Sequence, residues 1–492
     1  MNKEDTSMPV VVLATAAVLV AADAGAVSRE WRYAYNDNGQ LTSIDGPRND
    51  LDDVTQYTYD GAGHRVGVTN ALGQRMDMLD HNARGQPVRL VDANGVETVL
   101  DYHSRGWLLS STVHHPTDPQ RDATTVYTYD GEGQLLTTTL PSGIVLTNEY
   151  DSAHRLVAVQ NNRGERIEYK LDPAGNRTAT LTRDSGGTIV RSLGQAFDEL
   201  NRLIRITGSA GQITHYGYDS NGNRRSYTDG NGYTTIQEFD ALNRLTGTFA
   251  PLQHAVSYER DDQGNLTKIT DPRALVTRYD HDGLDNLVRL SSPDSGVTSY
   301  AYDEAGNRIG QTDANGVTVH YAYDALNRVT QVTYPDARLN VSYGYDTGAF
   351  GKGRLTTIED ASGSTTLLYD HRGKVVSQTL DNGTQILEIA YSYDLSGQLI
   401  QITYPSGRTV DYSYGSDGRV GAVNTAVEGA VRTLVDGVDY LPLGPPKAMT
   451  YGNGLVYSAE FDLDYRLVRM THGEVLETQY DYDGADNIAG IR

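Results

Sequence analysis

Hydrophobic and polar positions alternate in short stretches along nearly the whole chain. In residues 317–323, valine or tyrosine at every odd position alternates with smaller or polar residues. A period of two places the larger side chains on one face of a β-strand. The stretch ends at Asp324, and after a turn a second alternating stretch follows in residues 329–334. The pattern therefore predicts pairs of strands joined by turns.

This strand-and-turn pattern recurs with a spacing of 21 residues, and the segment from Asp198 to Asp324 contains six consecutive steps of 21. The first residue of the turn, usually Asp, marks each copy. The copies begin at Asn36, Asp60, Asn82, His103, Asp130, Asp151, Asp172, Asp198, Asp219, Asp240, Asp261, Asp282, Asp303, Asp324, Asp346, Asp370, Asp394, Gly415, Asp462 and Asp483. Such a register predicts a repeat architecture rather than a set of independent segments.

The turn chemistry explains the recurring Asp. Its carboxylate can accept hydrogen bonds from backbone N–H groups two or three residues on, and the third position, Asn327 in one copy, tolerates a left-handed backbone. Most copies have glycine there, at Gly63, Gly133, Gly175, Gly222, Gly264, Gly306 and Gly397. A second turn, such as residues 313–316, closes each unit. Each repeat is then strand, turn, strand, turn, with strands of roughly 6 residues and no place for a helix.

A two-stranded unit of this size is marginally stable in water, so each unit must stack on the next. The chain has 34 tyrosines against 5 phenylalanines, which indicates that the tyrosine hydroxyl is used in each repeat. We expect the aligned tyrosines to form a ladder along the sheet. At about 4.8 Å per strand, twenty units give roughly 190 Å of sheet, enough to wrap a cylinder of roughly 50 Å little more than once.

The predicted fold class is thus all-β, with antiparallel strand-turn-strand units wound into a curved, open or incomplete shell. A parallel solenoid with one coil per repeat also fits the numbers. The formal charge of −23 lies mainly in turns and, without a basic stripe, argues against a nucleic-acid partner. Cysteine is absent, which excludes thiolate zinc sites, thiol nucleophiles and disulfides.

The N-terminus differs from the repeats. An apolar run in residues 9–22 precedes small residues that fit a signal-peptidase site, although Lys3 is offset by Glu4 and Asp5. We predict a signal peptide at 1–26 and a single repeat domain at 27–492, with the repeat degenerate at 420–460. The predicted localisation is secreted or cell surface, with no integral membrane domain after the signal.

The repeated Tyr-x-Tyr-Asp-x-x-Gly pattern resembles the RHS, or YD-repeat, family, as at residues 302–308 and 239–245; family-like pieces also occur at 345–355 and 440–444. The resemblance covers about residues 31–492. It implies an antiparallel sheet wound into a cocoon, which in bacterial toxins encloses a toxic domain. The family's C-terminal core and effector are missing before Arg492, so the resemblance implies a truncated or split member, or one whose wall another chain completes.

No residue is predicted to be catalytic, cofactor-binding or metal-ligating. The recurrence of Asp at the equivalent position of most of the twenty copies indicates turn closure rather than acid–base catalysis, and Asp-rich turns such as 229–232 lack calcium-loop spacing. His114 and His115 are interpreted as a solvated loop pair. The turns at 208–211 and 415–418 resemble nucleophile turns only superficially.

The predicted function is that of a non-enzymatic shell or scaffold, without cofactor, in toxin encapsulation or delivery or in cell-surface interaction. Its partners would be a toxin or effector polypeptide, or a second RHS chain. One alternative is a surface adhesin or carbohydrate-binding repeat protein, in which exposed tyrosines would stack on surface glycans. A less favoured alternative is a polysaccharide-acting enzyme on a β-solenoid.

Overall fold

The computed structural model describes residues 12–17 and 29–492. In these residues one antiparallel sheet runs from β1 to β43, and each strand pairs with the next one in sequence, as β26 does with β27 and β27 with β28. The predicted all-β architecture of strand-turn-strand units is confirmed. The parallel-solenoid alternative is wrong, because neighbouring strands are joined by tight turns and run in opposite directions.

The first part of the sheet contains the following strands: β1 (Val12–Ala17), β2 (Glu30–Tyr35), β3 (Leu41–Asp45), β4 (Thr55–Tyr59), β5 (Arg65–Thr69), β6 (Arg75–His81), β7 (Pro87–Val91), β8 (Glu97–Tyr102), β9 (Leu108–Val113), β10 (Ala123–Tyr129), β11 (Leu135–Thr139), β12 (Val145–Tyr150), β13 (Leu156–Asn161), β14 (Arg166–Leu171), β15 (Arg177–Arg183), β16 (Ile189–Phe197), β17 (Leu203–Thr207), β18 (Ile213–Tyr218), β19 (Arg224–Thr228), β20 (Thr234–Phe239), β21 (Leu245–Ala250), β22 (His254–Arg260) and β23 (Leu266–Thr270).

The second part contains these strands: β24 (Val276–His281), β25 (Leu287–Ser292), β26 (Gly296–Tyr302), β27 (Arg308–Thr312), β28 (Thr318–Tyr323), β29 (Val329–Thr333), β30 (Val341–Tyr345), β31 (Leu355–Asp360), β32 (Gly363–Tyr369), β33 (Val375–Asp381), β34 (Ile386–Tyr393), β35 (Leu399–Thr403), β36 (Thr409–Tyr414), β37 (Val420–Val427), β38 (Ala430–Tyr440), β39 (Pro446–Tyr451), β40 (Val456–Phe461), β41 (Leu467–His472), β42 (Leu476–Tyr482) and β43 (Ile488–Ile491). Strands of five to seven residues predominate, as predicted. The expectation of no helix is wrong in detail, because longer connections hold three single-turn 3₁₀ helices in the described residues: η1 (Pro119–Arg121), η2 (Pro251–Gln253) and η3 (Ala337–Leu339).

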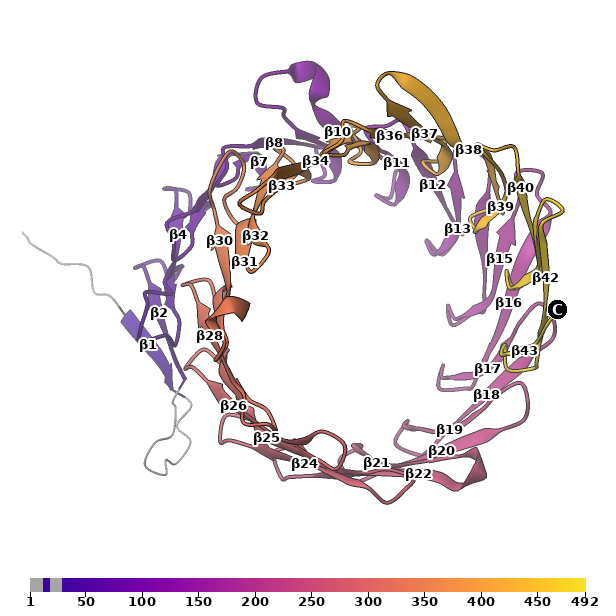
Figure 1. Ribbon diagram of the computed structural model, residues 1–492, viewed down its shortest axis with the longest axis horizontal. Helices are drawn as coiled ribbons and strands as arrows, with labels where there is room; N and C mark the ends of the chain where they lie inside the picture. Colours follow the sequence, from indigo (N-terminus) through magenta and orange to yellow (C-terminus); the bar gives the residue numbers. More distant parts are fainter. Residues whose placement is uncertain (1–11, 18–28) are drawn as a thin grey trace, which may run out of the picture.

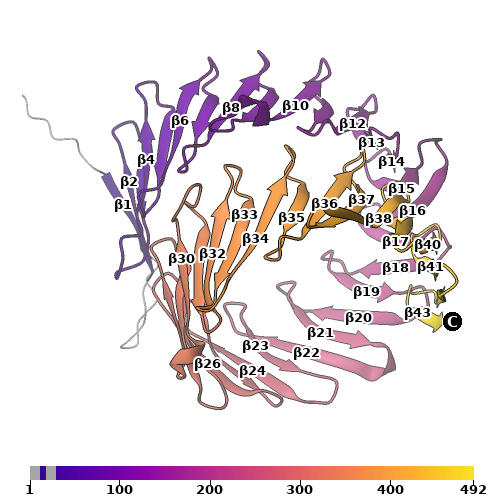
Figure 2. The same ribbon diagram turned by 45° about the horizontal axis from the view of Figure 1, so that its top comes forward.

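The sheet winds into a ring-like spiral around an open bore (Figures 1 and 2). We call the repeat-marking turns Asp turns, after their commonest first residue, and the turns at the opposite edge return turns. The backbone N–H of Ser142, in the return turn after β11, donates to Ser396 Oγ at 2.8 Å, in the Asp turn after β34. The separation of 254 residues recurs in other contacts between windings.

One winding therefore takes 23 strands, from β11 to β34. At about 4.8 Å per strand this is a path of roughly 110 Å. The described chain makes nearly two narrow windings, which corrects the expectation of little more than one wider turn. The odd number has a geometric reason. Opposite edges of a spiral ribbon meet where one winding abuts the next, so a return turn must meet an Asp turn.

The two edges differ in their strand pairing. At each Asp turn the register shifts by one residue, as between Ala301 and Tyr302, so the hairpin carries a β-bulge. The return turn between β27 and β28 has no such shift. A bulge bends its strand and increases the local twist. Only two of the described return hairpins, β15–β16 and β37–β38, carry such a shift. A bulge repeated at every Asp turn and rarely at the other edge gives the ribbon a consistent bend, which explains why it winds instead of staying flat.

The wall is one strand thick. Its accessible surface of 28377 Å² compares with roughly 18,000 Å² for a compact protein of this mass, because both faces of the sheet meet solvent. Few apolar side chains of the described residues are fully buried: Met78, Val96, Ala123, Ala158, Val332, Val410 and Ala459. The thin apolar layer expected from the composition is confirmed.

Only part of the predicted signal peptide lies within the described residues. Residues 12–17 form β1, paired antiparallel with β2, and the rest of the predicted signal peptide at 1–26 lies outside the described residues. Across the part of the chain that is described, no helix is long and apolar enough to cross a membrane.

Candidate functional site: the turn edges and the seam

The Asp turn is closed by one carboxylate. Asp324 Oδ1 accepts from the backbone N–H of Leu326 at 2.9 Å and of Arg328 at 3.0 Å. The third N–H, of Asn327, donates instead to the Asp324 backbone carbonyl at 3.0 Å. The carboxylate thus serves the second and fourth positions, which corrects the expected second and third. Asn327 has φ 59°, and the seven glycines predicted at its position all have positive φ.

One further Asp turn was not among the copies recognised in the sequence, because its first residue has no carboxylate. Leu441 begins it, with the usual backbone bonds from Leu441 N–H to the Pro445 carbonyl and from Gly444 N–H to the Leu441 carbonyl. The N–H of Leu443 donates to Glu165 Oε2 at 3.2 Å. Glu165 comes from the neighbouring winding, so it supplies the acceptor that the turn itself lacks. The repeat continues through residues 420–460.

The predicted use of the tyrosine hydroxyl is confirmed. In most repeats with a tyrosine before the Asp turn, its hydroxyl donates to the backbone carbonyl that follows the preceding Asp turn, as Tyr302 does to Leu287 at 2.9 Å. Burial raises the pKa of Tyr302. The same bond is made by Tyr59, Tyr129, Tyr150, Tyr218, Tyr323, Tyr345, Tyr369, Tyr393, Tyr414, Tyr440 and Tyr482. Each hydroxyl therefore ties one repeat to the one before it, a role that phenylalanine cannot fill.

The predicted ladder of tyrosine rings takes a different form. The residue four after the turn start lies over the ring that precedes the next turn: Arg328 lies 4.2 Å from the Tyr345 ring centroid, and Arg202 lies 4.7 Å from that of Tyr218. We call this pair the interlock. Among the described residues the one tyrosine–tyrosine ring pair is Tyr216–Tyr227. Cation–π contacts, rather than stacked phenols, connect successive repeats.

Trp107 fills the arginine position of one interlock. Its ring lies 5.5 Å from Tyr129 and stacks on His103 at 4.8 Å. A side chain at Gly133 would come within 2.6 Å of the indole, so the next turn packs closely on Trp107. The residue is explained by packing between repeats.

Amide side chains extend the connection between turns. Asn307 Nδ2 donates to Asn327 Oδ1 at 2.7 Å, and Asn223 Nδ2 donates to Asn243 Oδ1 at 2.8 Å. This explains why asparagine replaces glycine at the left-handed position of some turns. Both residues tolerate positive φ, but only asparagine offers an acceptor to the previous turn.

The windings meet along a seam of return turns and Asp turns. Glu165, whose side chain is 5% exposed, accepts from Arg419 Nη2 at 2.9 Å. Arg163 lies 3.1 Å from Asp417, whose side chain is 2% exposed. Two buried acids therefore each have a partner of opposite charge from the other winding, and the two arginines stay partly exposed, at 40% for Arg163 and 20% for Arg419.

The N-terminal end of the seam rests on Arg48, in the return loop between β3 and β4. Its guanidinium donates to the Asp324 carbonyl at 3.2 Å and lies 3.7 Å from Asp303. The hydrogen bond to Asp50 raises the pKa of Arg48 against the opposing effect of burial. Arg48 is only 8% exposed, so it is a structural cation of the seam.

The histidine loop also lies at the seam, and the expectation of a solvated pair holds only in part: the His114 side chain is 40% exposed, whereas His115 packs against the other winding. His114 Nδ1 contacts Asp122 at 2.7 Å, and the His115 ring packs edge-on against His371 at 4.6 Å. Both loop histidines are half-buried. His371, in an Asp turn of the other winding, is 5% exposed, and burial lowers its pKa.

The other turns singled out in the sequence are seam contacts as well. In the turn at 208–211, the N–H of Ser209 donates to Asp464 at 2.8 Å, and the turn at 415–418 carries Asp417. Asp229 Oδ1 accepts from the N–H of Asn231 at 3.0 Å. That carboxylate closes the turn at 229–232, which accounts for its acidity without calcium.

Comparisons with known proteins agree with this geometry. The Teneurin YD-shell model matches residues 19–170, and the RHS Repeat model matches seven segments: 197–234, 218–249, 239–276, 260–297, 281–318, 302–339 and 393–429. The chain belongs to the RHS, or YD-repeat, family. The family resemblance expected from the tyrosine–aspartate pattern is confirmed.

Among solved structures, this YD-repeat shell is similar to the TcdB2–TccC3 crystal structure, with TM-score 0.75, 14% identity and 98% of this chain covered. It is similar also to the Photorhabdus luminescens Tc holotoxin pore, with TM-score 0.74, 13% identity and 97% covered. The chain spans 31% and 32% of those chains. At this identity the likeness shows the fold.

A curated relative is the double-stranded DNA deaminase toxin A of Burkholderia cenocepacia (strain H111). It is 33% identical over 129 residues, which are 26% of this chain and 8% of that toxin. The shared segment is therefore a small part of a much longer protein.

Proposed function

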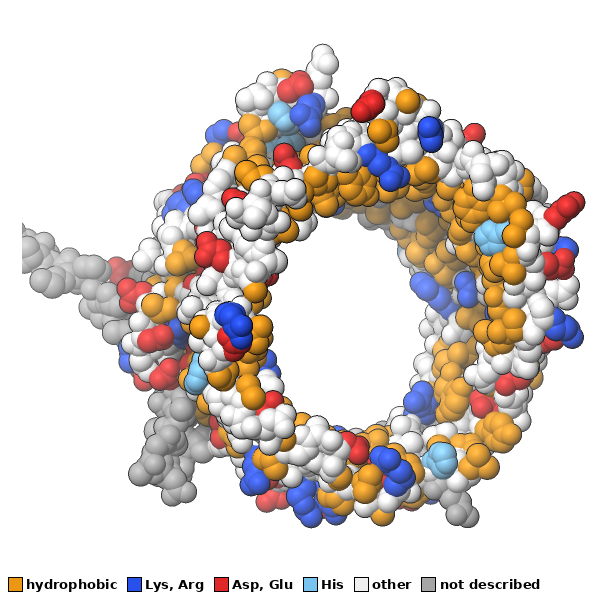
Figure 3. Space-filling view, viewed as in Figure 1, with side chains coloured by type: hydrophobic (Ala, Val, Ile, Leu, Met, Phe, Trp, Pro, Cys, Tyr) orange, Lys and Arg blue, Asp and Glu red, His pale blue; other side chains and the backbone are white. Residues whose placement is uncertain are grey.

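We propose that this YD-repeat shell encloses a polypeptide toxin or effector and acts as a container rather than an enzyme. The observation that carries the proposal is the bore. Figure 3 shows a continuous wall around it, with hydrophobic side chains over much of the inner surface. A wall of one strand has no internal core to bury these side chains, so they are available to a guest.

The alternation along the strands supports the assignment of the apolar face to the bore. In β28, Val319, Tyr321 and Tyr323 are half-buried, whereas His320 and Ala322 are exposed. On the concave face of a curved sheet, side chains converge and cover one another. The less exposed, more apolar set is therefore assigned to the bore, in agreement with the hydrophobic inner wall (Figure 3).

An apolar bore suits a polypeptide that is at least partly unfolded, because such a chain exposes the hydrophobic groups that a folded protein buries. The names of two similar proteins, a deaminase toxin and a Tc holotoxin, support a toxin as the guest. A second RHS chain that extends the wall at a free edge is the other proposed partner. Export to the cell surface or medium belongs to the same proposal.

The test is the binding of a permanently unfolded model polypeptide, reduced and carboxymethylated α-lactalbumin, compared with the native form. We expect the purified shell to retain the unfolded form during size-exclusion chromatography and to protect it from protease, and to do neither for the native form. Retention of neither form, or of both equally, would overturn the proposal.

Two variants of equal charge locate the binding surface. Val319→Glu with Tyr279→Glu places carboxylates on the inward set, and Ala322→Glu with Ser299→Glu places them on the outward set. We expect the inward variant to lose at least tenfold in affinity and the outward variant to bind like wild type. Circular dichroism melts establish that both are folded. Equal binding by two folded variants would show that the bore is not the binding surface.

A further inference from the structure

One interlock on the first winding departs from all others in its chemistry. At the position where later repeats place Arg202 or Arg328, the Asp60 turn has His64. At the position of the tyrosine before the next turn, it has His81. The two imidazoles stack with ring centroids 4.7 Å apart and an interplanar angle of 17°. A cation and a phenol are thus replaced by two metal-binding side chains.

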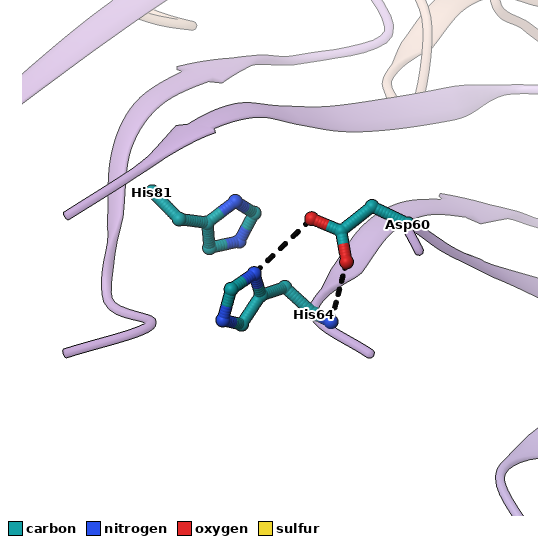
Figure 4. Close-up of side chains that lie close together, drawn as sticks. All are labelled: Asp60, His64 and His81. Atoms are coloured by element: carbon teal, nitrogen blue, oxygen red, sulfur yellow. Dashed lines mark hydrogen bonds and ion pairs between the residues drawn. The ribbon is translucent and has the colours of Figure 1, made fainter. Parts of the chain in front are cut away.

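The third member of the group is the turn carboxylate. Asp60 Oδ1 accepts from the N–H of Ala62 and of His64, so it is committed to the turn. Asp60 Oδ2 lies 3.1 Å from His64 Nδ1, as Figure 4 shows. One ligand atom each from Asp60, His64 and His81 lie within 4.8 Å of one another. The first oxygen keeps the turn closed, while the second oxygen contacts the imidazole nitrogen with which it would share an ion.

The neighbouring turn fixes the orientation of the His64 ring. A side chain at Gly85 would lie 3.0 Å from His64 Nε2 and Cδ2, so this edge of the imidazole rests on the next turn. His64 therefore presents Nδ1, not Nε2, toward Asp60. The His64 and Asp60 side chains are 34% and 35% exposed, so an ion reaches them from solvent without opening the wall.

The donor set selects a class of ion. Two imidazole nitrogens and one carboxylate oxygen suit zinc and its neighbours, which bind nitrogen at about 2.0–2.1 Å and oxygen at about 2.0–2.2 Å. Tetrahedral bonds of that length place ligand atoms about 3.4 Å apart. The Asp60–His64 pair, at 3.1 Å, is close to this separation, and His81 has to rotate out of its stacked orientation to join it. Calcium and magnesium prefer oxygen ligands alone.

We propose that Asp60, His64 and His81 form a site for a divalent transition metal of the zinc class at the exposed rim of the shell. The ion takes the place of the cation–π contact and joins the turn that begins at Asp60 to the strand that leads into the next turn. Three protein ligands leave a fourth position for water or for a ligand group from another molecule. The inference is independent of the proposed cargo.

The chain supplies its own control variant. His64→Arg with His81→Tyr introduces the Arg–Tyr interlock found in later repeats, such as Arg328–Tyr345, and removes both imidazoles. If the two histidines have only a structural role, this variant should fold and should behave like wild type toward metal ions. A metal site predicts that it folds but loses binding.

The experiment is a titration of the full chain with Co²⁺, followed by its visible absorption, and then displacement by Zn²⁺. We expect one equivalent to give the intense bands of low-coordinate cobalt, and Zn²⁺ to abolish them. His64→Arg with His81→Tyr should give no bands. Asp60→Asn should weaken binding by on the order of 10- to 100-fold. His320→Ala, far from the site in sequence, should leave the titration unchanged.

Binding should weaken as the pH falls, because protons compete for the imidazole nitrogens. Absence of stoichiometric binding to wild type would overturn the proposal, and so would equal binding by the folded double variant. A thermal melt without metal establishes the folding of each variant, so that a lost spectrum is not mistaken for a lost structure.

Discussion

The Asp turns of the first winding and those of the second share one motif but lie in different surroundings. In the first winding Asp240 and Arg244 remain 26% and 29% exposed. In the second, Asp417 is 2% exposed and faces Arg163 of the other winding. The difference teaches that one hairpin serves two purposes. It closes its own turn everywhere, and wherever a return turn reaches it, it also forms the seam.

Few residues are specific to the seam. Glu165 substitutes for a missing turn carboxylate, Arg48 enters between two Asp turns, and the backbones of Gly230 and Gly484 touch. Residues of the same type on the free rim lack a contact with the other winding. Substitutions at matched positions can therefore separate the stability of the hairpin from that of the spiral.

The largest effect is expected for Glu165→Ala. The substitution removes one of the two buried carboxylates that bind Arg419, Asp417 being the other, and leaves the Leu443 N–H without an acceptor, which should cost about 3 kcal/mol. Glu149→Ala, which removes a pair that is 46% exposed at the acid, should cost less than about 1 kcal/mol. Urea unfolding of both variants measures the difference. Similar losses would show that the seam contributes no more than an exposed pair.

Gly484→Ala should come next. An added Cβ would lie 2.5 Å from the Gly230 carbonyl oxygen, so the windings must move apart, at about 1–3 kcal/mol. Gly131 holds the same turn position on the free rim and has nothing within 4 Å of such a Cβ. Gly131→Ala should stay within about 0.5 kcal/mol of wild type. Thermal melts compare the two, and a tolerated Gly484→Ala would contradict the close approach.

Asp303→Ala should have a smaller effect of about 1–2 kcal/mol. It removes the acceptor of the Asn307 N–H at 2.8 Å and removes the carboxylate that faces Arg48 across the seam, so that Arg48 keeps only acidic partners of its own loop such as Asp50. Asp240→Ala removes the same turn acceptor on the free rim and should lower the melting temperature less. An equal decrease would mean that turn closure alone accounts for the loss.

The smallest effect on stability is expected from lowering the pH, because each carboxylate that becomes protonated contributes little on its own. The pKa of Asp483 is lowered to about 2, chiefly by the hydrogen bond from Asn231 across the seam. A lowered pKa means that the stabilisation is present above the unfolded pKa of about 3.9 and is lost as the pH falls toward 2.

Carboxyl NMR titration should show the pKa of Asp483 rising toward its ordinary value in Asn231→Ala. An unchanged pKa would assign the shift to the local turn. In Asp483→Asn the acid-dependent part of the melting curve that belongs to this group should disappear.

Much of the fold could be predicted from the sequence because most contacts are local. Asp324, Asn327 and Arg328 lie within five residues, and the Tyr302 hydroxyl reaches only 15 residues back, so a 21-residue period contains the hairpin and its tie to the next. The carboxylate-free turn at Leu441 was missed because its acceptor, Glu165, lies 278 residues away. The metal candidates His64 and His81 were missed because the interlock brings them together. They are 17 residues apart, a spacing that matches no simple metal-binding motif.

The sequence by itself determined the strands, the turns, the antiparallel sheet and the family, since each depends on contacts within one or two repeats. Only the tertiary structure decided the number of windings and the partners at the seam. The physical reason is accumulation. A small bend at each bulged hairpin, summed over 23 strands, sets which turns meet 254 residues apart, and no local pattern of residues encodes that sum.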